Sequence, residues 1–224
     1  MNYKKHILPR IGSPDNPVRL GVLISGSGSG MEALLNYQNK KQHCHHKTVL
    51  VISNKANAKG LERAESKQIQ TSVVKLPENT EGKISRQKHE ELIQMELEKY
   101  EVEVIILSGY MRILTPSFVE KWSGRLLNIH PSLLPQFPGA HAHQDVLASG
   151  IDVSGCTVHF VDSGVDTGMI IAQKSVIVYS DDTLEDLQER VKIQEHLIYP
   201  QVIDALCEGR LQIESTNCVI IQDP

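Results

Sequence analysis

Residues 126–135 read Leu-Leu-Asn-Ile-His-Pro-Ser-Leu-Leu-Pro, and the prediction of the fold starts from this stretch. Its first half, 126–129, is a short apolar run with a late polar residue, which predicts the end of a buried strand. Pro131 cannot continue a central strand because it has no backbone N–H, so Asn128 and His130 are expected at the carboxyl end. Alternate residues of a strand share a face, and ligands of open α/β sheets bind at this end.

The pairing of Asn128 with His130 has a chemical and a structural interpretation. An amide beside an imidazole suits the stabilisation of a developing oxyanion, and the imidazole can also transfer a proton. Alternatively, Asn128 ties down the following turn and His130 caps the edge of the sheet. Spacing alone leaves both interpretations open.

Composition excludes several classes of protein. The 224 residues carry a net charge of −4, so no basic field indicates a nucleic-acid partner. The four cysteines form no paired motif, which favours free thiols in a reducing cytoplasm. No apolar stretch approaches the ~20 residues of a membrane span. We therefore expect a cytoplasmic protein without a membrane or nucleic-acid partner.

The order of the predicted elements indicates the fold class. Apolar strands alternate with amphipathic helices from Val18 onward, which predicts a single α/β domain over 18–213 with a mostly parallel, twisted, Rossmann-like sheet and helices on both faces. The alternating stretch 156–178 is expected to add antiparallel strands. We expect a flexible arm over 1–17, a separate last helix after Pro200, and a peripheral tail over 214–224.

A glycine-rich turn, Ser25-Gly-Ser-Gly-Ser-Gly30, follows the first strand and precedes a helix that begins near Met31. Backbone amides at such a turn form an anion site. A dinucleotide fold would need an acidic residue at the end of the second strand, but residues 53–55 read Ser-Asn-Lys. This comparison favours a phosphate monoester over a dinucleotide.

Residues 43–46, His-Cys-His-His, suggest a metal site. They lie in a polar link next to Lys40, Lys41 and Lys47, and no second pair of ligands lies at the spacing of a zinc site. We therefore expect solvated loop residues and no metal.

Three motifs together carry a resemblance to a known family. They are Asn-Ile-His-Pro-Ser-Leu-Leu-Pro at 128–135, Pro-Gly-Ala-His-Ala at 138–142 and Val-Asp-Thr-Gly at 165–168. Over residues 19–210 the chain resembles the formyltransferases that use 10-formyltetrahydrofolate, and among them the phosphoribosylglycinamide formyltransferases of purine synthesis. The resemblance implies transfer of a formyl group from the folate to the amine of glycinamide ribonucleotide, without a metal, by a monomer or weak homodimer.

The same resemblance implies roles for individual residues. Asn128, His130 and Asp166 would be catalytic, with Thr157 and His159 facing the site. The ribonucleotide would be bound by Gly28, Ser29, Gly30 and Glu195, and the folate by Arg86, Met111, Arg112, Ile113, Leu114 and Asn128. Without the resemblance, Arg86 and Glu195 read as surface residues, and Met111, Ile113 and Leu114 as core.

Two departures from the family pattern concern the substrate sites. Gly30 stands where the family usually has Asn, and Met169 stands where it commonly has Pro.

The Asp166 loop is flanked by Gly164 and Gly168, so its carboxylate can reach over the strand end and favour the imidazolium form of His130.

Three other functions are alternatives to formyl transfer onto glycinamide ribonucleotide. Methionyl-tRNA formyltransferase would require a further domain and a basic surface for tRNA, neither of which the sequence indicates. Formyltetrahydrofolate hydrolase would bring a regulatory domain and a motif that departs from His-Pro-Ser. A non-catalytic folate- or nucleotide-binding protein is the least favoured, because Asn128, His130 and Asp166 are all present.

Overall fold

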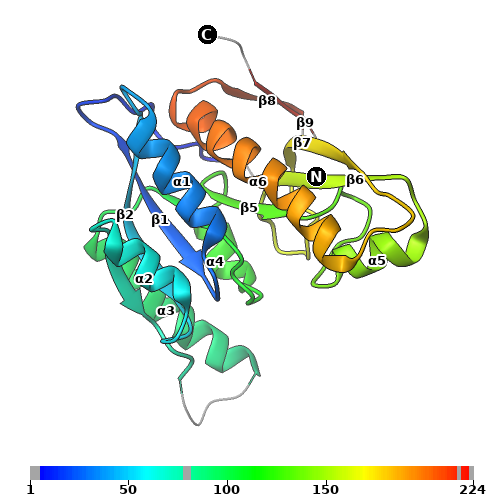
Figure 1. Cartoon of the computed structure of the whole chain (residues 1–224). Helices are drawn as coiled ribbons and strands as arrows, with labels where there is room; N and C mark the ends of the chain where they lie inside the picture. Colours follow the sequence, from blue (N-terminus) through cyan, green and yellow to red (C-terminus); the bar gives the residue numbers. More distant parts are fainter. Residues whose placement is uncertain (1–5, 78–81, 216–217, 222–224) are drawn as a thin grey trace.

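A computed structural model describes residues 6–77, 82–215 and 218–221 (Figure 1). Its main sheet has seven strands in the order β3-β2-β1-β4-β5-β6-β7. Strands β1 to β5 pair in parallel, whereas β6 and β7 pair antiparallel. The strands are β1 (Val18–Ile24), β2 (His46–Ser53), β3 (Gln70–Val73), β4 (Val104–Leu107), β5 (Leu126–His130), β6 (Val153–Phe160) and β7 (Ile170–Ile177). The predicted α/β class and the antiparallel addition are confirmed.

Helices cover both faces of this sheet. They are α1 (Ser29–Lys40), α2 (Lys59–Ser66), α3 (Gly82–Lys99), α4 (Pro116–Lys121), α5 (Ala142–Ser149) and α6 (Leu184–Cys207). Alternate strand residues face opposite sides. Val22 therefore packs in the core under α1, α2 and α6, while Leu23 packs in the core under α3 and α4. The apolar strands predicted from sequence thus bury both of their faces.

The carboxyl ends of the central strands position the candidate site. The chain passes from β1 outward to β2 and β3, then returns to β4 on the other side of β1. The strand order therefore reverses between β1 and β4, which is where ligands bind in such sheets. Three features lie at this edge of the sheet. They are the glycine-rich turn at 25–30 after β1 (the anion loop), the 108–114 segment after β4, and His130 at the end of β5.

Residues 6–17 have no regular secondary structure but lie against the domain. Arg10 pairs with Glu103, with 2.6 Å between Nε and Oε1. The Gly12 amide donates to the carbonyl of Cys207 at 2.8 Å. These contacts make this part of the predicted arm pack on the domain instead of lying apart from it.

The carboxyl-terminal region differs from the prediction in two ways. Helix α6 continues through Pro200, so the prediction of a separate last helix is wrong. A proline inside a helix costs about 3 kcal/mol, but buried residues on both sides of it, among them Val191 and Ile203, fix the helix on the sheet. Strands β8 (Leu211–Ser215) and β9 (Cys218–Ile221) pair antiparallel across the predicted boundary between domain and tail at residues 213 and 214, and β9 contacts β7.

Among the helices of the described residues, none combines the length and the apolar character that crossing a membrane requires.

Candidate active site

The imidazole of His130 lies between two oxygen acceptors. Its Nδ1 is 3.3 Å from Oδ2 of Asp166, and its Nε2–H donates to the carbonyl of Phe137 at 2.8 Å. A neutral imidazole has one donor and one acceptor nitrogen, whereas the imidazolium has two donors. The ring therefore has an oxygen acceptor beside each nitrogen, and only a ring with two N–H groups could donate to both. His130 is buried, so solvent does little to weaken the interaction.

The two residues that contact this imidazole both have a left-handed backbone. Asp166 and Phe137 each have φ of 53°. Aspartate tolerates this region, but a bulky aromatic residue rarely adopts it, and such strain is concentrated at functional sites. The Gly139 amide donates to Oδ2 of Asp166 at 2.8 Å, so the 137–139 loop fixes the carboxylate as well as the imidazole. Neither Phe137 nor Gly139 could be predicted from sequence, because both contribute through backbone atoms.

His159 orients the amide of Asn128 from the neighbouring strand, since the two residues are direct partners across β5 and β6. The Nδ1–H of His159 donates to the Phe160 carbonyl at 2.9 Å. Burial lowers the pKa of His159, so the neutral ring accepts from Nδ2 of Asn128 at 3.2 Å through its Nε2. One amide N–H of Asn128 is used in this bond, and its second N–H remains for a ligand.

Thr157 supports the site without lining it. It is fully buried opposite His130, and its hydroxyl donates to the Ser132 carbonyl at 2.7 Å. The same oxygen accepts from the Leu134 amide at 3.0 Å and from Gln173 Nε2 at 2.8 Å. Thr157 thus fixes the chain immediately after His130.

A groove of about 380 Å³ runs alongside Asn128, His130 and Asp166. Its other wall includes the whole predicted folate segment, Met111, Arg112, Ile113 and Leu114. The side chains of Met111 and Ile113 are 69% and 62% exposed, whereas Leu114 is buried in the core. Two exposed apolar side chains beside a groove can receive a flat, mostly apolar ring, so the core interpretation applies to Leu114 alone.

The predicted anion loop is joined to the wall of this groove. The Met111 amide donates to Oγ of Ser25 at 2.9 Å, and the Ser25 amide donates to the Gly109 carbonyl at 3.1 Å. Gly28 has φ of +67°, and a Cβ there would lie 2.7 Å from Cα of Gly60. Only glycine therefore fits at residue 28, where the loop turns into α1 and meets α2.

Five predicted binding residues are not among the residues that line the groove: Gly28, Ser29, Gly30, Arg86 and Glu195. Arg86 is in the second turn of α3 and is half-buried. Glu195 lies on α6, where burial raises the pKa of its carboxyl to about 7. Their roles in binding stay predictions.

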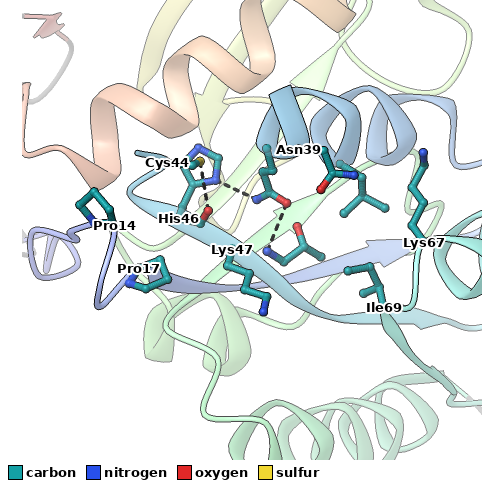
Figure 2. Close-up of a pocket in the computed structure, with 11 residues that line it drawn as sticks. Pro14, Pro17, Asn39, Cys44, His46, Lys47, Lys67 and Ile69 are labelled. Carbon is teal, nitrogen blue, oxygen red and sulfur yellow. Dashed lines mark hydrogen bonds between the residues drawn. The ribbon is translucent and has the colours of Figure 1, made fainter. Parts of the chain in front are cut away.

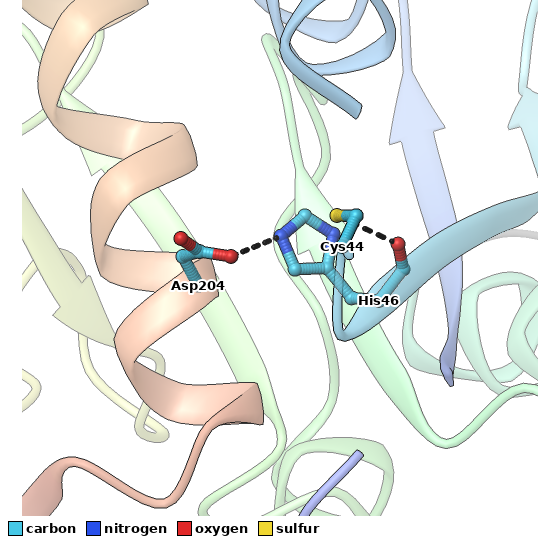
Figure 3. Close-up of side chains that lie close together, drawn as sticks. All are labelled: Cys44, His46 and Asp204. Atoms are coloured by element: carbon cyan, nitrogen blue, oxygen red, sulfur yellow. Dashed lines mark hydrogen bonds and ion pairs between the residues drawn. The ribbon is translucent and has the colours of Figure 1, made fainter. Parts of the chain in front are cut away.

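A second group of polar side chains lies at the opposite end of the sheet. Cys44, His46 and Asp204 offer ligand atoms within 4.8 Å of one another (Figure 3). His46 is the first residue of β2 and is only 1% exposed, so its prediction as a solvated loop residue is wrong. The partner of the buried His46 imidazole is the carboxylate of Asp204 on α6, which is distant in sequence.

A lysine already balances the charge of this group. The ammonium of Lys41 contacts Oδ2 of Asp204 and lies 2.7 Å from Oε1 of Glu208. A divalent cation bound to Asp204 would meet this positive charge at close range. A pocket of about 250 Å³ adjoins Cys44 and His46 and is also lined by Lys47 and Lys67 (Figure 2). The group could therefore hold a metal only if Lys41 moved away.

The fold and the site define a class of α/β protein in which an amide and an imidazole lie at the carboxyl end of β5, with a carboxylate from the loop after β6 beside them. Residues 18–203 match the model of the formyl transferase family, and the chain belongs to that family.

Two individual proteins show which members of this family the chain is similar to. The chain is 42% identical over 192 residues to phosphoribosylglycinamide formyltransferase from Escherichia coli, covering 86% of this chain and 88% of that protein. A crystal structure of glycinamide ribonucleotide transformylase 1 from Symbiobacterium toebii is similar with a TM-score of 0.85 and 40% identity, covering 92% of this chain and 95% of that one.

Longer relatives contain this region as one part. The chain is 45% identical over 213 residues to the trifunctional purine biosynthetic protein adenosine-3 of Gallus gallus, covering 95% of this chain. It spans only 20% of the length of that protein.

Proposed function

We propose that the protein transfers the formyl group of 10-formyltetrahydrofolate to the amine of N1-(5-phospho-D-ribosyl)glycinamide. The products are formylglycinamide ribonucleotide and tetrahydrofolate, in purine biosynthesis. The observation that carries the proposal is the position of Asn128, His130 and Asp166 beside a groove with an exposed apolar wall. The names of the Escherichia coli and Symbiobacterium toebii relatives support the same substrate.

The reaction begins with attack of the substrate amine on the formyl carbon. A new C–N bond forms, and the carbonyl π pair moves to oxygen, which becomes an oxyanion. The free N–H of Asn128 would donate to that oxygen, where charge develops only in the transition state. The His130 imidazolium would donate to it from Nε2, exchanging its bond to the Phe137 carbonyl for one to the oxyanion. Asp166 would keep His130 protonated and oriented.

Collapse of the intermediate completes the transfer. The bond between the formyl carbon and N10 of the folate breaks, and the proton lost by the attacking amine is delivered to N10. His130 is the group placed to carry that proton, directly or through a water molecule. Every step uses side chains of this chain, and the proposal assigns no step to a metal.

The remaining contacts follow the binding residues expected from sequence. Gly28, Ser29 and Gly30 would hold the phosphate through backbone amides at the start of α1, and Glu195 would accept hydrogen bonds from the ribose. Met111 and Ile113 would pack on the pterin, with Arg86 and Arg112 meeting the charged part of the folate. The reaction needs two small molecules, and we propose a cytoplasmic monomer or weak homodimer that binds neither nucleic acid nor membrane.

One assay tests the proposal against its nearest rival. The protein is incubated with 10-formyltetrahydrofolate with and without glycinamide ribonucleotide, and tetrahydrofolate and formylglycinamide ribonucleotide are measured. We expect product only when both substrates are present, in equal amounts. Release of free formate at the same rate without the ribonucleotide would indicate a hydrolase instead.

A further inference from the structure

Ser108 lies where the two substrate regions meet. It directly follows β4, the strand beside β1, and its amide donates to the Leu23 carbonyl at 3.0 Å. The anion loop leaves the adjacent end of β1 and is joined to the 109–111 segment by Ser25. Ser108 therefore stands between the loop that ends in α1 and the segment that walls the groove.

The hydroxyl of Ser108 is directed at Gly30, the second residue of α1. A Cβ built on Gly30 would lie 2.8 Å from Oγ of Ser108, and no other heavy atom outside the adjacent chain lies within 4 Å of it. The hydroxyl thus occupies the side of residue 30 where a side chain would begin. A larger residue at position 30 requires this serine to move.

The hydroxyl has no hydrogen-bond partner among the described residues, although Ser108 is only 8% exposed. Neighbouring hydroxyls differ in this respect. Ser25 Oγ donates to Asn54 Oδ1 at 2.7 Å, and Ser53 Oγ donates to the Lys55 carbonyl at 2.9 Å. The Ser108 side chain is mostly buried, but its oxygen is not one of the fully buried unpaired atoms of the described residues. The hydroxyl is therefore free to donate to a ligand that lies beside the amino end of α1.

We propose that the Ser108 hydroxyl donates a hydrogen bond to the phosphate of the ribonucleotide, beside the amides of α1. The inference rests on the proposed function. The first amides of a twelve-residue helix lack internal partners and attract an anion. Ser108 would add a side-chain donor from β4 at the position where Gly30 provides none.

Steady-state kinetics of Ser108→Ala test this role. A hydrogen bond to a charged group is worth roughly 1.5–3 kcal/mol, which corresponds to about a 10- to 100-fold rise in KM for the ribonucleotide. The KM for the folate and the melting temperature should stay unchanged. Ser66→Ala, which removes an exposed hydroxyl on α2, is the matched control and should alter neither constant.

A double-variant cycle separates donation from packing. Gly30→Asn alone should impair ribonucleotide binding, because the new Cβ meets Oγ of Ser108. Combining it with Ser108→Ala removes the obstacle and supplies the amide donor, so the double variant should bind better than either single variant. Simple additivity of the two losses would overturn the proposal.

Direct binding keeps this inference separate from the proposed function. Calorimetry with inorganic phosphate should show weaker binding to Ser108→Ala than to the unaltered protein, whether or not the protein transfers formyl groups. An active protein whose Ser108→Ala variant keeps its ribonucleotide KM and its phosphate affinity would refute the inference and leave the function intact. Equal loss of both substrates together with a lower melting temperature would also refute it, because Ser108 would then be structural.

Discussion

Two histidine–aspartate pairs with the same separation lie at opposite ends of the sheet. His130 Nδ1 and Asp166 Oδ2 are 3.3 Å apart at the carboxyl end of β5, and His46 Nε2 and Asp204 Oδ1 are 3.3 Å apart at the amino end of β2. Both imidazoles are buried. Geometry of the pair alone therefore does not distinguish a catalytic site from a structural one.

The other partners of each carboxylate make the difference. Asp204 also contacts Lys41 and accepts from the hydroxyl of Tyr37 at 2.7 Å. Burial alone would raise the pKa of Asp204, but hydrogen bonds from His46, Lys41 and Tyr37 lower it well below its usual range. A fixed ammonium thus keeps Asp204 ionised and paired. Asp166 has no lysine or arginine partner among the described residues, and it faces the groove.

The largest expected difference between the pairs is in turnover. Asp166→Asn should lower kcat by roughly 10²–10⁴, the usual worth of a positioned acid–base group, because the negative charge beside Nδ1 of His130 is lost. Substrate affinities and the melting temperature should change little. Asp152→Asn, an exposed aspartate just before β6, serves as the control. Near-normal turnover of Asp166→Asn would reduce Asp166 to a residue that stabilises its own turn.

Within the proposed catalytic site, Asn128→Ala should reduce kcat by roughly 10²–10³, the scale for loss of one oxyanion donor. The KM for each substrate should change far less, because the lost bond forms only in the transition state. Rapid-mixing single-turnover kinetics measure the chemical step directly. A rise in KM with unchanged kcat would instead identify Asn128 as a binding residue.

Substitution in the His46–Asp204 pair should change the stability of the protein and leave its turnover intact. Asp204→Asn should lower the free energy of unfolding by about 3 kcal/mol, because the buried imidazole of His46 loses its carboxylate and the half-buried Lys41 keeps only Glu208 as a partner. Urea denaturation measures this change, and kcat at a temperature where the variant is folded should match that of the unaltered protein. A fall in kcat with unchanged stability would reverse the assignment of the two pairs.

The same pair predicts a pH dependence of stability. Burial alone would lower the pKa of His46, but hydrogen bonds with Asp204 and Cys44 outweigh it and raise the pKa above 6.5. A raised pKa in the folded state means that this stabilisation is complete below pH 6.5 and is lost as the pH rises through the folded-state value. The urea midpoint should therefore decline with rising pH in this window, and Asp204→Asn should flatten the decline.

The smallest effect is expected at a third carboxylate, which contacts neither lysine nor histidine among the described residues. Burial raises the pKa of Glu195 to about 7, with Lys192 opposing the shift. If its ionised form binds the ribose, KM for the ribonucleotide should rise a few-fold as the pH falls from 8 to 6. Glu195→Gln should remove that dependence, and a parallel profile in the variant would exclude Glu195 as its source.

Structural features that depend on residues close together in sequence could be predicted, because local patterns of apolar residues specify them. The strand ends at β1, β4 and β5 followed from apolar runs interrupted by glycine or proline, and the predicted helices followed from apolar residues at helical spacing. Asn128 and His130 could be placed on one face because the period of a strand is two. The family was identified from three short motifs, and the match over residues 18–203 confirms it.

Sequence by itself determined the class of fold and the placement of Asn128 and His130 at the carboxyl end of a strand, because both depend on local periodicity and on residues a few positions apart. The groove wall at residues 111–114 was expected only from the family resemblance. Tertiary structure alone decided the pairing of His46 with Asp204, the position of Phe137 and Gly139 around His130, and the approach of Ser108 to Gly30. It also decided the passage of α6 through Pro200. These features arise from packing between distant segments, and a local pattern cannot encode which distant residue will lie opposite.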